Sequence, residues 1–130
     1  MAKNGRAASA TAVTWLPEPE EHDYPAATSF LSLVFPRATV TRVVARLRAA
    51  RIEQYKVKDI MRASGLALLP ATDSDVARDL VKVRKKRSLS PVLLVQTPGR
   101  LVVADGYHRV CAVYHLDEDA EVACKLVGSS

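Results

Sequence analysis

The residue types best suited to chemistry lie together in one short segment, Asp105-Gly106-Tyr107-His108-Arg109. An apolar run precedes this segment, and a pattern of helical period follows it. A strand that turns through glycine into a helix leaves free backbone N–H groups at the positive end of the helix dipole. Phosphate is a frequent occupant of such a site, and a neighbouring arginine can bind it with two hydrogen bonds. The segment therefore predicts an anion-binding turn.

Each residue of this turn has a candidate role. Gly106 would let a ligand approach the backbone closely, and Arg109 would hold its phosphate. His108 would help to bind the phosphate or carry a proton, and Asp105 is a candidate catalytic carboxylate. Tyr107 belongs to the ligand-binding turn by position, although its ring is expected to pack rather than act as a nucleophile. The structural alternatives are a plain tight turn and an Arg109–Asp105 ion pair on the surface.

A second part of the site is predicted at Asp59 and Arg62. Apolar and polar residues alternate over 51–60, which is typical of a strand with one buried face, and Asp59 would end that strand. If this strand shares a sheet with the strand that ends at Asp105, the two carboxylates could hold Mg²⁺ beside a nucleotide phosphate. Asp59 is then a catalytic candidate and Arg62 a ligand-binding one.

The other residues that often carry chemistry form no known motif. His108 and His115 lie seven residues apart, which is too far for two ligands of one ion, and the sequence shows no third ligand, so no metal-ligating residue is predicted. Cys111 and Cys124 match no zinc spacing and are expected to be buried free thiols. The sequence contains no Walker loop, dinucleotide-binding glycine motif or serine-hydrolase elbow.

The pattern around the turn predicts an α/β (α+β) domain, a small mixed sheet with surrounding helices and a helical N-terminal extension. A single domain is expected over 23–130, with its core at about 51–127, after a flexible arm at 1–22. The strands are expected at 51–60, 92–95, 101–104 and 121–127, and the helices at 25–35, 38–50, 72–87 and 107–115.

Three local details accompany this arrangement. Phe30, Leu31, Val34 and Phe35 are expected on the apolar face of the first helix, and Thr72 is expected to cap the third. Trp15 and Leu16 would anchor the arm on its own domain or on a second copy, which would make a homodimer.

The charge of the chain permits anionic partners. Its 130 residues carry a formal net charge of +5. The basic residues gather at Arg42, Arg46, Arg48 and Arg51, and again over 82–87. One alternative function is therefore a nucleic-acid-binding module that uses these basic helix faces, and another is a non-catalytic interaction protein. The structural alternative is a solvated helix face with cations at the end of a helix.

Other features of the sequence indicate where in the cell the protein is located. No apolar stretch approaches the ~20 residues of a membrane span, and the first fifteen residues lack the apolar core of a secretory signal. A cytoplasmic protein without a membrane partner is therefore expected.

The stretch from Leu89 to Val127 resembles the ParB/sulfiredoxin-like superfamily. It reads "LSPVLLV", a turn, "LVVADGYHRVCAVYHL", a loop and "AEVACKLV". In that superfamily a strand follows a proline-marked turn, a second strand runs into an Asp-Gly-x-x-Arg helix start, and a last strand closes the unit. The resemblance implies a nucleotide site at the glycine turn: CTP in ParB proteins, ATP in sulfiredoxins and ADP in certain serine kinases. By position, Gly106, His108 and Arg109 match its phosphate-binding residues, and Asp105 the acidic position of the kinase-like members.

The chain also departs from this superfamily. Tyr107 stands where sulfiredoxins have their catalytic cysteine, so that chemistry is not expected. The Glu-Arg-Arg cluster of ParB proteins is absent, and so is their following helix-turn-helix domain, so a full partition protein is not expected. The predicted function is a ParB-like domain that binds ATP, ADP, CTP or another phosphorylated ligand. Phosphoryl transfer or nucleotide hydrolysis would follow if magnesium is held, and whether the chain is an enzyme stays open.

Overall fold

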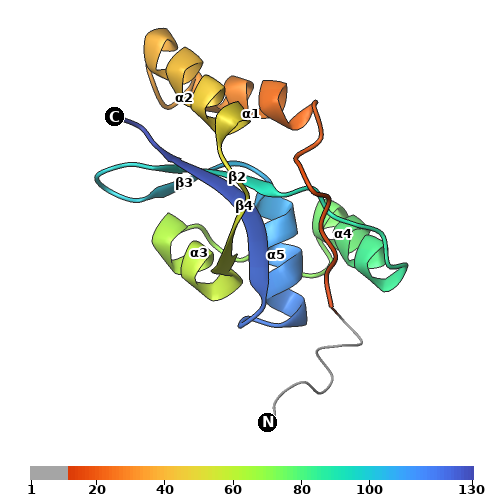
Figure 1. Cartoon of the computed structure of the whole chain (residues 1–130). Coiled ribbons are helices and arrows are strands. Elements are labelled where there is room, and N and C mark those ends of the chain that lie inside the picture. Colours follow the sequence, from red (N-terminus) through yellow and green to blue (C-terminus); the bar gives the residue numbers. More distant parts are fainter. Residues whose placement is uncertain (1–11) are drawn as a thin grey trace.

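The computed structural model describes residues 12–130 as a four-stranded mixed sheet between two layers of helices (Figure 1). In chain order the elements are α1 (Asp23–Leu31), α2 (Arg37–Ala49), β1 (Glu53–Lys56), α3 (Val57–Ser64), α4 (Ser74–Arg84), β2 (Val92–Gln96), β3 (Leu101–Asp105), α5 (Tyr107–Leu116) and β4 (Glu121–Gly128). The predicted mixed sheet with surrounding helices is confirmed. Within this range no helix combines the length and the apolar character needed to cross a membrane.

The sheet places its first and third strands at opposite edges. Its order is β1-β4-β2-β3. β1 pairs antiparallel with β4, β4 parallel with β2, and β2 antiparallel with β3. The central strands are therefore β4 and β2, and the end of β3, where the predicted turn begins, lies far along the sheet from β1.

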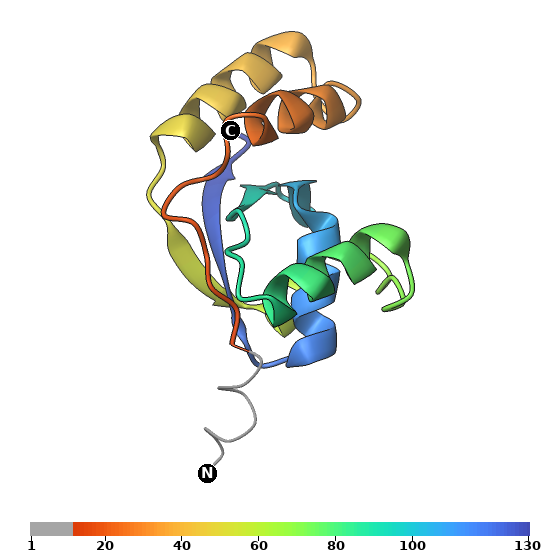
Figure 2. The same ribbon diagram turned by 90° about the vertical axis from the view of Figure 1, so that its right-hand side faces the viewer.

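Alternate side chains of β2 face the two helical layers. Leu93 and Val95 belong to the core formed with α1 and α2, whereas Val92 and Leu94 belong to the core formed with α3 and α5. A strand that is buried on both faces has a continuous run of apolar residues, and this run is why β2 could be predicted from the sequence. Figure 2 shows α1 and α2 above the sheet, away from α5. The predicted helical extension is thus one of the two layers that cover the sheet.

α4 packs across α5, and this contact brings the first turns of the two helices together (Figure 2). The fully buried Val76 of α4 packs against Cys111 and Ala112, whose small side chains permit a close approach. The Oδ2 atom of Asp73 caps α4, because it accepts hydrogen bonds from the backbone N–H groups of residues 75 and 76, both at 3.1 Å. The prediction that Thr72 caps this helix is wrong by one residue.

The described part of the predicted flexible arm is docked on its own domain. Trp15 forms a parallel bridge with Leu89, and the Leu16 N–H donates to the Leu89 carbonyl at 2.8 Å. The Glu20 N–H donates to the Ser90 hydroxyl at 3.1 Å. Residues 12–22 are therefore part of the fold, while the rest of the predicted arm, 1–11, lies outside the described residues.

The strand predicted over 51–60 is wrong in its second half. β1 is an edge strand that ends at Lys56, and its side chains are exposed on both faces. The helix α3 follows at once, with Val57, Ile60 and Ser64 on its buried face and Gly65 in the left-handed conformation at its end. The short alternation of apolar and polar residues over 51–58 favoured a strand, so the helical spacing of these buried residues was not recognised.

The first helix is shorter than predicted. α1 buries Tyr24, Ala27 and Leu31, which lie at helical spacing on one face, and it ends at Leu31. Phe30 falls one residue outside that face and is 45% exposed, and Val34, beyond the helix, is 44% exposed. The predicted apolar face is therefore confirmed for Leu31, which is buried, and for Phe35, which packs against the same core, but it is wrong for Phe30 and Val34.

A buried lysine on β4 joins this strand to the helical layer above it. Lys125 is 1% exposed. Its ammonium group donates to the Tyr24 hydroxyl at 3.1 Å, to the Arg48 carbonyl at 3.0 Å and to Glu18 at 2.9 Å. Burial alone would lower the pKa of Lys125, but the hydrogen bonds to Glu18 and Tyr24 outweigh it and the pKa is raised. The stabilisation is complete at neutral pH and is lost only as the pH rises above ~10.5.

We expect Lys125→Ala to lower the free energy of unfolding by about 3 kcal/mol, since it removes a buried charge from three partners and leaves a cavity. Lys125→Met keeps most of the volume and should cost less. Lys58→Ala is the matched control, because it breaks an exposed pair with Asp119 and should cost below about 1 kcal/mol. Urea unfolding followed by circular dichroism measures all three. Equal losses for Lys125→Ala and Lys58→Ala would contradict the structural role of Lys125.

Candidate functional site

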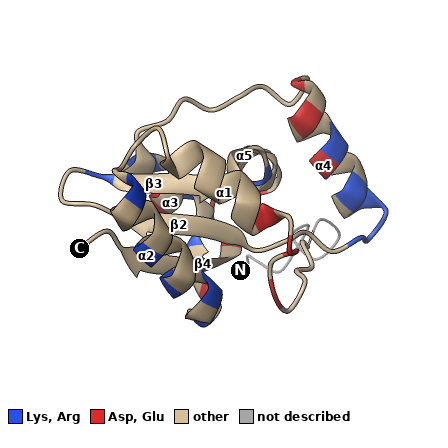
Figure 3. Ribbon diagram, turned by 90° about the horizontal axis from the view of Figure 1, so that it is seen from above, with Lys and Arg blue, Asp and Glu red and all other residues tan. Residues whose placement is uncertain are grey.

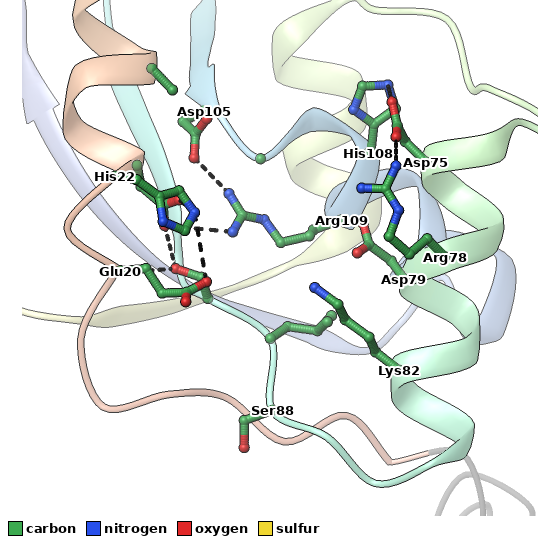
Figure 4. A pocket seen from close by; sticks show the side chains of 15 residues that line it. Glu20, His22, Asp75, Arg78, Asp79, Lys82, Ser88, Asp105, His108 and Arg109 are labelled. Atoms are coloured by element: carbon green, nitrogen blue, oxygen red, sulfur yellow. Dashed lines mark hydrogen bonds and ion pairs between the residues drawn. The ribbon is translucent and has the colours of Figure 1, made fainter.

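The predicted turn opens into a cavity of ≈ 330 Å³ (Figure 4). This volume is at the lower end of the ~300–1,000 Å³ of small-ligand sites. Its walls come from parts of the chain that are distant in sequence: residues 20–26, 75–82, 88–90 and 105–109. The cavity thus depends on the docked N-terminal segment and on the crossing of α4 over α5.

Gly106 is required at the start of α5 for two reasons. Its φ is +107°, which only glycine adopts without strain. A Cβ atom at this position would lie 2.7 Å from Nη2 of Arg109 and 3.0 Å from Cγ2 of Val92. The glycine therefore lets the Arg109 guanidinium lie directly over the turn. The backbone N–H groups of 107–109 begin the helix and have no partner within it.

Arg109 is held between two carboxylates. Nη2 lies 2.7 Å from Oδ2 of Asp105, and Nη1 lies 3.6 Å from Oδ2 of Asp23. Its side chain is 13% exposed, so the predicted ion pair with Asp105 exists but is largely buried. The Ser90 hydroxyl donates to Asp23, which fixes that carboxylate. Burial raises the pKa of Asp105; the Arg109 charge opposes this effect and the Asp23 charge adds to it.

Two histidines face each other across the cavity, each beside carboxylates (Figure 4). Nε2 of His108 lies 3.5 Å from Oδ2 of Asp75, on the α4 side. Nε2 of His22 lies 3.4 Å from Oδ1 of Asp23, on the α1 side. His115 instead contacts the Leu69 carbonyl at 2.7 Å, so the two histidines of α5 do not share a site.

Asp79 is a buried carboxylate that the sequence reasoning missed. It is 8% exposed, and among residues 12–130 no hydrogen-bond donor or ion-pair partner reaches it directly. Figure 4 shows it pointing into the cavity from α4, near Lys82. Burial raises its pKa, which nearby Lys82 and Arg109 partly offset. The sequence does contain an indication of this burial. Asp79 lies three residues after Val76 and four before Val83, so it is a charged residue on the apolar face of a helix.

The structure does not bring Asp59 and Arg62 to the turn. Nη2 of Arg62 lies 2.7 Å from Oδ1 of Asp59, as an exposed pair within α3, and neither residue lines the cavity. Asp59 does not end a strand, and β1 before it is at the opposite edge of the sheet from β3. The magnesium pair predicted from Asp59 and Asp105 therefore does not form.

Tyr107 also lies outside the cavity lining, although it follows Gly106 directly. Its ring packs against the core on both sides of α5. Burial and the neighbouring Cys111 thiol raise the pKa of its hydroxyl to about 12, so it stays protonated at neutral pH. Both cysteines are buried free thiols, as predicted.

The cavity lining carries more negative than positive charge. Five carboxylates face three permanent cations, which leaves an excess of two negative charges when both histidines are neutral. The carboxylates are Glu20, Asp23, Asp75, Asp79 and Asp105, and the cations are Arg78, Lys82 and Arg109. A bare anion is disfavoured by this balance, whereas a phosphate that arrives with a divalent cation is not.

The predicted arginine face of α2 is largely turned toward the chain itself. Arg42 and Arg46 donate to carbonyl oxygens of residues 128–130, and Arg48 pairs with Glu21 at 2.7 Å. The basic run 84–87 differs, because its side chains are exposed and carry no ion pair within the described part of the chain. Figure 3 shows this basic end of α4 and its turn apart from α2.

No protein-family model, curated protein or solved structure matches this chain. The resemblance to the ParB/sulfiredoxin-like superfamily therefore rests on the residues of the turn and the order of the elements, and it stays a prediction.

We expect Gly106→Ala to lower the free energy of unfolding by about 2 kcal/mol or more, through backbone strain and the clash with Arg109. Gly65→Ala should cost about 1 kcal/mol, because its φ of +68° is strained for alanine while the space around it is open. Gly99→Ala has open space and no positive φ, so it should cost below about 0.5 kcal/mol. Urea unfolding measures the series. A Gly106→Ala cost no larger than that of Gly65→Ala would show that Arg109 does not press on the turn.

We expect Asp79→Asn to raise the melting temperature at pH 7 by roughly 2–4 °C, because it removes a buried carboxylate without a direct partner. The raised native pKa means that the stability contributed by Asp79 falls as the pH rises from its ordinary value of 3.8 through the raised one. The gain should therefore vanish below about pH 3.5, where the wild-type carboxyl is also protonated. Thermal unfolding at both pH values tests this, with the exposed Glu121→Gln as control. A lower melting temperature at pH 7 would show that Asp79 is well compensated.

Proposed function

We propose that this domain binds a nucleotide such as ATP, ADP or CTP, or another phosphorylated small ligand, at the Gly106 turn. One observation carries the proposal: the glycine-led start of α5, with the Arg109 guanidinium above it, opens into a cavity of ligand size. Helix starts of this kind combine backbone N–H donors with a positive dipole end, which suits a phosphate group.

The cavity supplies further donors for a phosphate. Arg109 offers five N–H bonds, and its two ion pairs leave others to share with a ligand. Lys82 projects into the cavity from α4 (Figure 4) and forms no ion pair within residues 12–130. The two cations approach from different walls, so a phosphate between them would contact both.

The excess of carboxylates indicates that the phosphate binds together with a divalent cation. Mg²⁺ bound to nucleotide phosphates usually takes only one or two protein carboxylates, and Asp105 lies at the turn itself. Phosphoryl transfer or hydrolysis at this site would rest on positioning and charge neutralisation by Arg109 and the helix start. Asp105 remains a candidate for proton transfer, as does His108 when no metal ion is bound to it, whereas Asp59 is too far along the sheet to take part.

A second candidate function has its own observation. The exposed basic run 84–87 adjoins the cavity through Lys82 and Ser88, and it carries no ion pair among the described residues. We propose this run, rather than the arginines of α2, as the contact for nucleic acid if the domain binds it. Such binding would weaken steeply between 50 and 200 mM salt, unlike binding of a nucleotide in a cavity.

The test is a thermal-shift series with ATP, ADP, CTP and GTP, each with Mg²⁺. A ligand at about one hundred times its Kd should raise the melting temperature by roughly 5–10 °C. We expect Arg109→Ala and Lys82→Ala to abolish the shift, and Arg62→Ala, on α3, to keep it.

Arg109→Ala leaves the buried carboxylates of Asp105 and Asp23 unpaired and can prevent folding. In that case Lys82→Ala is the variant that tests the proposal. No shift with any of the four nucleotides, or a shift that survives both substitutions, would overturn the proposal.

A further inference from the structure

We propose that one first-row transition-metal ion binds where the start of α5 faces the start of α4, held by His108, Asp75 and Asp73. The metal would lie on the α4 side of the cavity, across from Glu20 and His22. This proposal is independent of nucleotide binding, because all three ligands come from the protein.

The spacing of the three side chains suits an ion better than a direct contact. Nε2 of His108 lies 3.5 Å from Asp75 and 3.9 Å from Asp73, which is too long for good hydrogen bonds. Two ligands that each lie ~2.0–2.2 Å from a common ion, at angles between tetrahedral and wider, are ~3.3–4.0 Å apart. The three ligand atoms lie within 4.8 Å of one another.

Each carboxylate is oriented by one contact and keeps an oxygen for the ion. Oδ1 of Asp75 pairs with Arg78, which leaves Oδ2 facing His108. Oδ2 of Asp73 caps α4 and is also the oxygen that lies 3.9 Å from Nε2 of His108, whereas Oδ1 has no hydrogen bond within residues 12–130. The cap and the arginine therefore fix the two carboxylates before any ion arrives, which lowers the entropic cost of binding.

Asp79 is the independent observation that points to a cation here. It lies one helical turn after Asp75 on the same face of α4 and points into the same cavity. With 8% exposure and no direct partner in the described chain, it is a negative charge in a place where charge is costly. A divalent ion at Asp75 and His108 would offset that charge.

The donor set selects the kind of metal. Mg²⁺ and Ca²⁺ prefer oxygen ligands alone, whereas an imidazole with carboxylates suits Zn²⁺ or Fe²⁺. Cys111 and Cys124 are buried away from the cavity and do not compete. Three protein ligands leave coordination positions for water or an anionic ligand, and these positions would face the cavity that holds Arg109.

The other histidine cluster provides the control. Glu20, His22 and Asp23 are also close enough to hold an ion. Asp23, however, is committed to Arg109 and to the Ser90 hydroxyl. We therefore expect no metal there.

The experiment is isothermal titration of the untagged full chain with Zn²⁺, and separately with Mg²⁺, without nucleotide. We expect one Zn²⁺ per chain and at least tenfold weaker binding of Mg²⁺. His108→Ala and Asp75→Asn should each weaken Zn²⁺ binding at least tenfold, and Asp79→Asn should weaken it less. Asp73→Asn should also weaken it while α4 keeps its cap, since asparagine caps helices as well as aspartate. His22→Ala should leave it unchanged.

Three results would overturn the metal proposal: no saturable Zn²⁺ binding, unchanged binding in both His108→Ala and Asp75→Asn, or an equal loss in His22→Ala. Circular dichroism confirms that each variant is folded, and His108→Gln replaces His108→Ala if the latter is not. Because nucleotide is absent, failure here leaves the nucleotide proposal standing. Conversely, a failed nucleotide series leaves the metal result unaffected.

Discussion

The buried guanidinium of Arg109 is the interaction on which the rest of the site depends. It joins the end of β3, through Asp105, to the start of α1, through Asp23, and it does so directly above the Gly106 turn. Loss of the arginine would leave the carboxylates of Asp105 and Asp23 buried without their shared cation, which is far more costly than loss of an exposed pair. One cation therefore holds these three segments together around the cavity. The N-terminal segment is fixed beside them, because the Ser90 hydroxyl accepts a hydrogen bond from the Glu20 N–H and donates one to Asp23.

This pairing leaves the cavity with a surplus of negative charge, which shapes what can bind. The cation nearest the turn is already neutralised, while Asp79 has no direct partner among the described residues. A phosphate alone would meet this surplus, but a phosphate with a metal ion would relieve it. The nucleotide and metal proposals are thus compatible, because an ion at His108 would lie in the same cavity as the Gly106 turn and would add positive charge to that cavity.

Sequence patterns predicted the elements whose signals are local. β2 is apolar throughout because both of its faces are buried, and the Gly106 turn is marked by a glycine that its φ requires. Prediction failed where a segment depends on distant contacts. The anchoring of Trp15 and Leu16 on their own domain, one of the two predicted alternatives, is confirmed, but the partners of this segment could not be predicted. They are the backbone of Leu89 and the hydroxyl groups of Ser88 and Ser90, which lie about 70 residues away in the sequence. Asp59 was placed at a strand end because the alternation before it continued past the point where α3 begins.

The sequence by itself determined the α+β character, the order of the elements from β2 to β4 and the glycine turn between β3 and α5. Those properties follow from apolar period and from glycine, which act within a few residues. Only the tertiary structure decided which side chains share the cavity with that turn. It excluded Asp59 and Arg62 and brought in Asp23 and Asp79, because strand order and helix crossing set distances between residues that are far apart in the chain.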